Sequence, residues 1–368
     1  MKNRYLWIAL FFLVGMGACA KDHEAVEPEQ TMQVMVQIAV RATTKAFGPA
    51  TGDGSVAAVE NGTVFFLSAE GLIVSRGTIN KTQIITGQLF NNINSTAKEV
   101  YVVANYKANS TTDLKLTACT TKAEIMNVSQ IIDVNTGIPN VTLVNSVDFT
   151  GFDANKDNGV IVAGSGNRKA YVLLCPALAR IEITDIQTVD PVVVEYTLAG
   201  LYIDNFYPSF YMACGKGGVG TRLFGGTTNQ LASNNFPQKD GQLTKSIAGV
   251  ARPVVSNPEI IWLYHTTPTL GGGIDLPRVV VVFESVTIRV GATTKTLKNK
   301  YLTVTGYFDS TNTPIAKLEA GKVYRTGAGK FLFRYGDLAD TPNPEKLDVS
   351  INVQILSWSE IVFPPVAL

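Results

Sequence analysis

The side chains that most often carry out catalysis are scarce in this sequence. Its two histidines are His23 and His265, and His265 lies inside an apolar run beside Tyr264. A Ser-His-Asp or Cys-His site would have to use His265, and no nucleophile motif surrounds any serine or cysteine. A working carboxylate pair depends on proximity in space, and nothing in the sequence favours one. The sequence therefore predicts that the chain is not an enzyme and uses no cofactor.

One short segment has oxygen ligands at alternate positions, as a calcium loop does. Asp153, Asn155 and Asp157 are followed by an Asn-Gly pair. Carboxylate and amide oxygens at this spacing can converge on a hard cation. The glycine comes one position late, however, and Gly164 stands where a bidentate glutamate would close the loop. A solvated turn is the favoured interpretation and calcium the weaker one, so no metal site is assigned.

A cysteine follows an apolar run near the N-terminus. Two basic residues precede the run Tyr5–Val14, which is too short to span a bilayer and is typical of a signal peptide. Gly17 and Ala18 then place small residues before Cys19. This arrangement resembles the lipobox of bacterial lipoproteins, in which the cysteine becomes the acylated first residue. It implies a signal peptide over residues 1–18 and a precursor held to the outer membrane by lipid on Cys19; the alternative is an ordinary cleaved signal that contains a cysteine.

Charge and cysteine content narrow the remaining classes. The formal net charge is +1, and removal of the leader brings it to about neutral, so no basic field is left to bind nucleic acid. Beyond Cys19, the cysteines are Cys119, Cys175 and Cys214, too few and too odd in number for a disulfide framework. We expect thiols that fill the core, with one bridge possible and its partners left open.

Short β-type runs separated by turn residues predict an all-β protein built from sandwiches. The 368 residues exceed what one core usually organises, so two domains are expected, joined near Asn167-Arg168-Lys169. One short helix is expected after Thr121, because Thr121 and Glu124 have the spacing of a capping box.

The two ends of the chain carry similar strand patterns. Each has five apolar residues at alternate positions, which predicts a strand with one buried face. In the N-terminal strand these are Met32, Val34, Val36, Ile38 and Val40. In the C-terminal strand they are Leu347, Val349, Ile351, Val353 and Ile355, with Trp358 following after a change of phase.

Basic residues follow the N-terminal strand at Arg41 and Lys45, in a stretch exposed to proteases. Either end strand could fill the same apolar groove, and a short tether would favour the N-terminal one through its high effective concentration. A cut after Lys45 would remove that advantage and admit the C-terminal strand of another copy. Donor and groove are different surfaces, so such a contact would grow into an open filament.

These features together resemble the fimbrillins, the pilus subunits of type V fimbriae of the Bacteroidales. The resemblance includes the lipoprotein leader, Lys45-Ala46-Phe47-Gly48 after the first strand, and several later segments. These segments are Val100–Asn105, Leu178–Ile183, Leu201–Asn205 and Val353–Trp358. The cleavage residue is Lys45 where the family's major pilin has Arg, which leaves Arg41 as a rival site.

The resemblance implies two tandem transthyretin-like β-sandwiches with at most one or two short helices. The expected parts are an acidic tether and removable strand over 19–45, domains over 46–168 and 169–346, and a donor strand over 347–368. Expected partners are copies of the chain, other fimbrial subunits and a trypsin-like protease that cuts between Lys45 and Ala46. The expected location is the outer membrane and the cell-surface fimbria. The role within the fimbria (stalk, anchor or tip) and the adhesion target stay open, and the alternative is a surface lipoprotein that binds glycan or host protein without polymerising.

Overall fold

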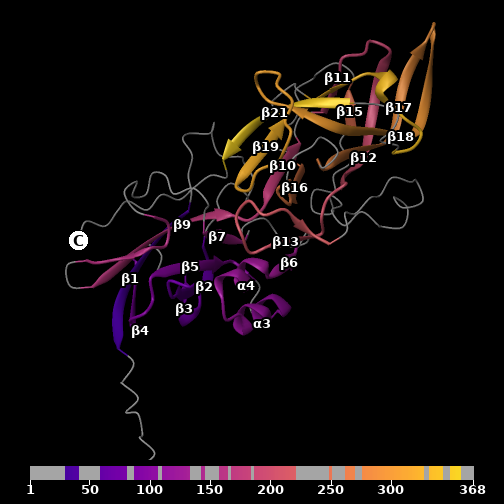
Figure 1. Ribbon diagram of the computed structural model, residues 1–368. Coiled ribbons are helices and arrows are strands. Elements are labelled where there is room, and N and C mark those ends of the chain that lie inside the picture. The colour runs from indigo at the N-terminus through magenta and orange to yellow at the C-terminus, as the bar shows by residue number, and fades with distance from the viewer. Residues whose placement is uncertain are drawn as a thin grey trace, which may run out of the picture.

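The computed structural model describes residues 30–40, 59–80, 87–106, 110–132, 142–145, 157–164, 167–183, 186–220, 248–250, 262–269, 276–326, 331–342 and 349–357. Over these ranges the chain forms two large β-sheets, two small sheets and two short α-helices (Figure 1). The prediction of a mainly β fold built from sandwich-type sheets is confirmed, and the described ranges hold two short helices.

The first sheet lies at the lower left of Figure 1 and is built mainly from the first half of the chain. Its order is β3-β2-β5-β7-β9-β1-β4, and β8 also pairs with β9. The strands are β1 (Thr31–Val40), β2 (Asn61–Leu67), β3 (Ile73–Asn80), β4 (Gln88–Asn94), β5 (Glu99–Ala104), β7 (Leu143–Asn145), β8 (Ile161–Val162) and β9 (Arg168–Pro176).

The second large sheet lies at the upper right, in the order β15-β12-β17-β18-β21-β19-β10-β16. A separate parallel pair, β11 and β20, packs beside it, followed by the 3-10 turn η2. The elements are β10 (Ala179–Ile183), β11 (Ile186–Thr188), β12 (Val193–Asp204), β15 (Ala248–Val250), β16 (Trp262–Thr266), β17 (Arg278–Val290), β18 (Thr293–Phe308), β19 (Lys322–Thr326), β20 (Phe331–Phe333), η2 (Tyr335–Asp337) and β21 (Val349–Ser357).

The chain passes from the first sheet to the second between β9 and β10. The sequence predicts a domain boundary after residue 168, which is the first residue of β9. The change from one sheet to the other comes later, after the end of β9. The second small sheet joins the halves. In it, β6 (Ser129–Ile131) pairs with β13 (Ser209–Tyr211), which also pairs with β14 (Gly218–Val219). The two halves are therefore linked by backbone hydrogen bonds as well as by the chain itself.

Both helices begin with a capping residue. In α4 (Lys122–Asn127), Thr121 and Glu124 form the capping box that the sequence predicts. The preceding helix α3 (Thr111–Ala118) was not predicted; its N-cap is Ser110, whose hydroxyl accepts a hydrogen bond from the backbone of Asp113.

The helices cover one face of the first sheet. Lys122 of α4 lies over the ring of Tyr101 in β5, and Arg76 of β3 donates to the carbonyl oxygen of Thr117 in α3. Because the other face is the core, β2 and β5 are buried on both sides, and consecutive residues there are apolar.

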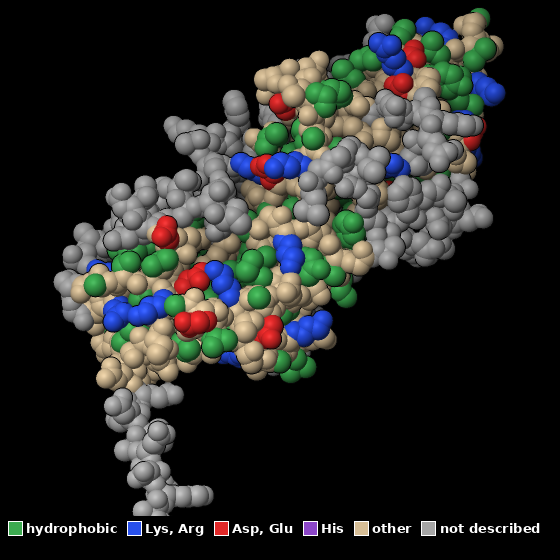
Figure 2. Space-filling model, viewed as in Figure 1, with side chains coloured by type: hydrophobic (Ala, Val, Ile, Leu, Met, Phe, Trp, Pro, Cys, Tyr) green, Lys and Arg blue, Asp and Glu red, His purple; other side chains and the backbone are tan. Residues whose placement is uncertain are grey.

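Acidic and basic side chains of the described residues are mixed on the face shown in Figure 2. This distribution agrees with the near-neutral charge of the sequence. Among the described helices, none is long and apolar enough to cross a membrane.

Candidate assembly site

The N-terminal strand β1 is an internal strand of the first sheet. It runs parallel to β9, from Val34 opposite Arg168 to Val40 opposite Leu174, and antiparallel to β4 on its other edge. The strand thus has a neighbour on each side. Its removal would therefore open a slot within the sheet, with unpaired backbone groups on both walls.

The inward face of β1 matches the predicted alternation. Val34, Val36 and Ile38 are 0%, 1% and 4% exposed, whereas Gln33 is exposed and Gln37 half-buried. Met32 packs partly buried against the core, and only the backbone of Val40 is described. At about 1.5–3 kcal/mol per buried side chain, the three central residues contribute roughly 5–9 kcal/mol to holding β1 in place.

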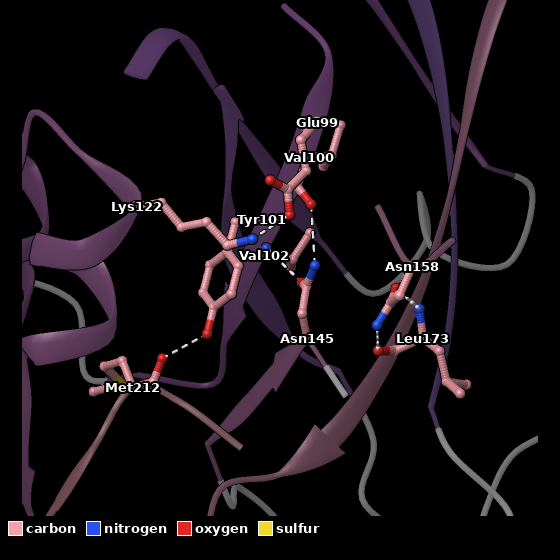
Figure 3. A network of polar contacts seen from close by, with 9 residues as sticks. All are labelled: Glu99, Val100, Tyr101, Val102, Lys122, Asn145, Asn158, Leu173 and Met212. Atoms are coloured by element: carbon pink, nitrogen blue, oxygen red, sulfur yellow. Dashed lines mark hydrogen bonds and ion pairs between the residues drawn. The ribbon is translucent and has the colours of Figure 1, made fainter. Parts of the chain in front are cut away.

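The wall formed by β9 is secured on its far edge, away from β1. β8 pairs with its first half, and β7 pairs with Leu174–Pro176. Between them, the amide side chain of Asn158 bonds both backbone groups of Leu173, donating at 2.9 Å and accepting at 2.8 Å (Figure 3). The backbone of Gly159 donates to the carbonyl of Tyr171. This edge of β9 is thus bonded along most of its length.

A second asparagine ties β7 to β5 in the same way. The side chain of Asn145 donates to the carbonyl of Val100 and accepts from the backbone N–H of Val102, and it is buried (Figure 3). Nearby, Glu99 of β5 forms an ion pair with Lys122 of α4. Side-chain amides therefore replace backbone pairing where β7 is too short to continue the ladder.

The segment that follows β12 bonds the C-terminal half of the chain to β5 and to the end of β9. The buried hydroxyl of Tyr101 donates to the carbonyl of Met212 at 2.7 Å (Figure 3). Burial raises the pKa of Tyr101, so this phenol stays a hydrogen-bond donor at physiological pH. Cys175, at the end of β9, is disulfide-bonded to Cys214, and the free Cys119 is buried. The pairing that the sequence left open is thus Cys175 with Cys214.

The predicted donor strand is an internal strand of the second sheet. β21 runs parallel to β18 through Val349–Asn352 and antiparallel to β19 through Val353–Ser357. Ile351 and Val353 are buried, Asn352 is half-buried and Ile355 is 46% exposed. Before it could enter another copy, this strand would have to leave both of its neighbours.

Several predicted site residues lie outside the described part of the chain. These are Cys19, Arg41, Lys45, Ala46, Asp153, Asn155, Leu347 and Trp358. Asp157 is described, and no group of three potential metal ligands occurs in the described ranges. Asn158, part of the segment weighed as a calcium loop, instead supports β9. A short polar turn gives no sequence signal for that role.

The described histidine, His265, lies on β16 opposite Arg180 of β10. Burial, and next the positive charge of Arg180, lower its pKa to about 3, so the ring is neutral at neutral pH. Arg180 and Arg325 both form ion pairs with the buried Glu182. His265, itself half-buried, thus lies beside the buried ion pair of Arg180 and Glu182 in the second sheet.

No family model matches the chain, and no curated protein sequence matches it. Several solved structures match the chain in fold. A proposed cell adhesion protein from Parabacteroides distasonis superposes with a TM-score of 0.59 at 15% identity, over 91% of this chain and 99% of that one. A second such protein from this species gives 0.54 at 12% identity, over 90% and 100%. A fimbrilin from Porphyromonas gingivalis gives 0.50 at 11% identity, over 90% and 99%. At these identities the likeness is one of fold: the chain folds like the fimbrilins and cell adhesion proteins of the Bacteroidales.

Proposed function

We propose that the chain is a structural subunit of a cell-surface fimbria. It is exported as a lipoprotein, loses β1 by a cut after Lys45, and polymerises when the C-terminal strand of another copy enters the slot. The observation that carries this proposal is the place of β1: a strand near the start of the chain occupies an internal position in the sheet and is followed by basic residues. The fimbrilin-like fold supports it.

The cut would act as the switch between monomer and polymer. While β1 is tethered, its effective concentration at the slot is of the order of millimolar or more, which excludes a strand from another molecule. Once the tether is cut, β1 competes as a separate peptide and a second copy can displace it. The domains expected over 46–168 and 169–346 would then be the repeating unit of the filament.

Limited digestion of the full-length chain with trypsin tests this switch. Wild-type protein should acquire an N-terminus at Ala46 and form a ladder that resists SDS. Lys45→Ala should abolish the N-terminus at Ala46, but because trypsin also cuts after Arg41, the ladder should be lost only when Arg41 and Lys45 are both replaced by Ala. A ladder formed by the double variant, or a wild-type chain that is cut at Lys45 and stays monomeric, would contradict the proposal.

The membrane anchor needs its own test in cells. Cys19→Ala should abolish labelling by a fatty-acid analogue and release the precursor from the membrane fraction, because the thiol is the acyl acceptor. A variant that is still labelled would contradict lipidation at this position.

The alternative, glycan binding without polymerisation, would use the aromatic-rich segment Phe206–Tyr211 as a platform for sugar, but of its aromatic residues only Tyr207 and Tyr211 are partly exposed. Phe206 and Phe210, in the segment that joins the two halves, are buried. Their faces pack in the core and present no platform for a sugar ring.

A further inference from the structure

The strand on the other side of β1, β4, is held differently from β9. In the described part of the chain, β1 is the single strand that pairs with β4, which ends the first sheet. The register between them slips between Met32 and Val34. When β1 leaves, β4 therefore loses its backbone pairing with the one neighbouring strand that it has among the described residues.

Side-chain packing also holds β4, through the buried residues Phe90 and Ile93, and Phe90 makes the contacts with β2 and β3. Its ring lies edge-on to Phe66 of β2, with centroids 5.2 Å apart. It also lies against Gly77 of β3, where an added Cβ would come 2.3 Å from Cε1 of Phe90. One hydrogen bond, from the backbone N–H of Asn94 to the hydroxyl of Ser75 at 3.1 Å, closes the end of this contact. The ring of Phe90 thus fits its seat only because residue 77 has no side chain.

The opposite wall is secured by backbone and covalent bonds. β9 keeps β7, β8 and the side chain of Asn158 on its far edge whether or not β1 is present. The Cys175–Cys214 disulfide ties its end to the second half of the chain. Removal of β1 would thus leave β9 bonded along its far edge, whereas β4 would be held by the side-chain packing of Phe90 and the buried Ile93.

We propose that the slot has a fixed wall, β9, and a hinged wall, β4, and that Phe90 seated on Gly77 is the latch that closes β4 over a strand from a second copy of this chain. β1 shows what fits: an extended strand parallel to β9, with β-branched apolar side chains at alternate positions. β21, with Ile351 and Val353 at alternate positions, has this chemistry. The inference rests on the proposed function for the identity of the occupant, but the unequal walls can be tested without any polymer.

Distances between spin labels on the full-length chain test the hinge. One label pair joins Asn91 on β4 to Asn61 on β2, and the other joins Arg168 on β9 to Asn61; all three residues are exposed. β1 is released by two routes, Val36→Asp in the uncut chain and trypsin cleavage after Arg41 or Lys45. We expect the Asn91–Asn61 distribution to broaden on release and to narrow again when a synthetic peptide of residues 31–40 is added. The Arg168–Asn61 distribution should stay narrow throughout.

Gly77→Ala tests the latch, with Gly336→Ala as its matched control, because a Cβ at Gly336 meets no atom within 4 Å. With β1 released, Gly77→Ala should bind the labelled 31–40 peptide at least about tenfold more weakly than wild type, since the added methyl displaces Phe90. Gly336→Ala should bind it as wild type does. Equal affinities for the two variants, or equal broadening of both label pairs, would overturn the proposal. A failure to polymerise with unequal walls would instead count against the proposed function alone.

Discussion

A charge on the buried face of β1 should make the uncut chain assemble. Val36 is 1% exposed and lies opposite Ala170 of β9 and Gln88 of β4. Val36→Asp would remove about 2 kcal/mol of apolar burial and place an unpaired carboxylate in the core, at a cost of several kcal/mol. That total is comparable with the roughly 5–9 kcal/mol that the three central side chains of β1 contribute. β1 should therefore leave the slot even though it is still tethered.

The assay is the appearance of an SDS-resistant ladder from full-length protein in the absence of any protease. Val36→Asp is expected to form it, whereas wild type is expected to stay monomeric. Gln37→Asp is the matched control, because it adds the same charge at a half-buried position on the opposite face of the strand. It should behave like wild type.

Two further observations separate release of β1 from general unfolding. The amide proton of Leu173, held by Asn158, should stay protected from exchange in Val36→Asp if the rest of the sheet is intact. Free 31–40 peptide in excess should suppress the ladder by refilling the slot. If Val36→Asp releases β1, keeps Leu173 protected and still stays monomeric, occupancy of the slot by β1 is not what prevents assembly.

Three other changes have defined outcomes. Ile351→Asp should block assembly, and because Ile351 is buried in its own sheet it should also lower the free energy of unfolding by several kcal/mol. Asn352→Asp should assemble normally, and equal ladders from the two variants would argue against β21 as the donor strand. Replacing Cys175 and Cys214 together by Ala should lower the free energy of unfolding, measured in urea, by about 4 kcal/mol, which is the chain-entropy value for a loop of 39 residues. A change under 1 kcal/mol would show that other contacts hold the two halves together. The pKa of His265 falls from 6.5 to about 3 on folding, so at acid pH the unfolded state binds a proton that the folded state does not. The free energy of unfolding should therefore drop as the pH falls below 6.5, by at most about 2 kcal/mol at pH 5. Urea titrations of His265→Gln should lose this pH dependence, and an unchanged dependence would assign it to another group.

Local patterns were sufficient to predict the elements that depend on local chemistry. The alternation of Val34, Val36 and Ile38 predicted both the strand and its buried face, and Thr121 with Glu124 predicted the start of α4. These features depend on the period of a strand and on a cap three residues away, which a single sequence displays directly.

Pairing between distant segments could not be predicted in the same way. Nothing in residues 31–40 indicates that β9 and β4 flank them, because register is decided by contacts far along the chain. Helix α3 was missed because its buried side chains are Thr112 and Leu116, too few to give a helical period. Asn145 and Asn158 are single polar residues whose roles depend on where β5, β7 and β9 meet.

The bridge between Cys175 and Cys214 has a mechanical consequence for a chain loaded along its length. The two residues are 39 positions apart, and chain of that length would extend to about 130 Å if it unravelled under tension. With the bridge closed, a pull on β9 passes through the sulfur atoms to Cys214, and β10, β11, β12 and β13 lie inside a loop that carries no load. That stored length is released only after chemical reduction, so under oxidising conditions a stretched subunit yields in other parts of the chain.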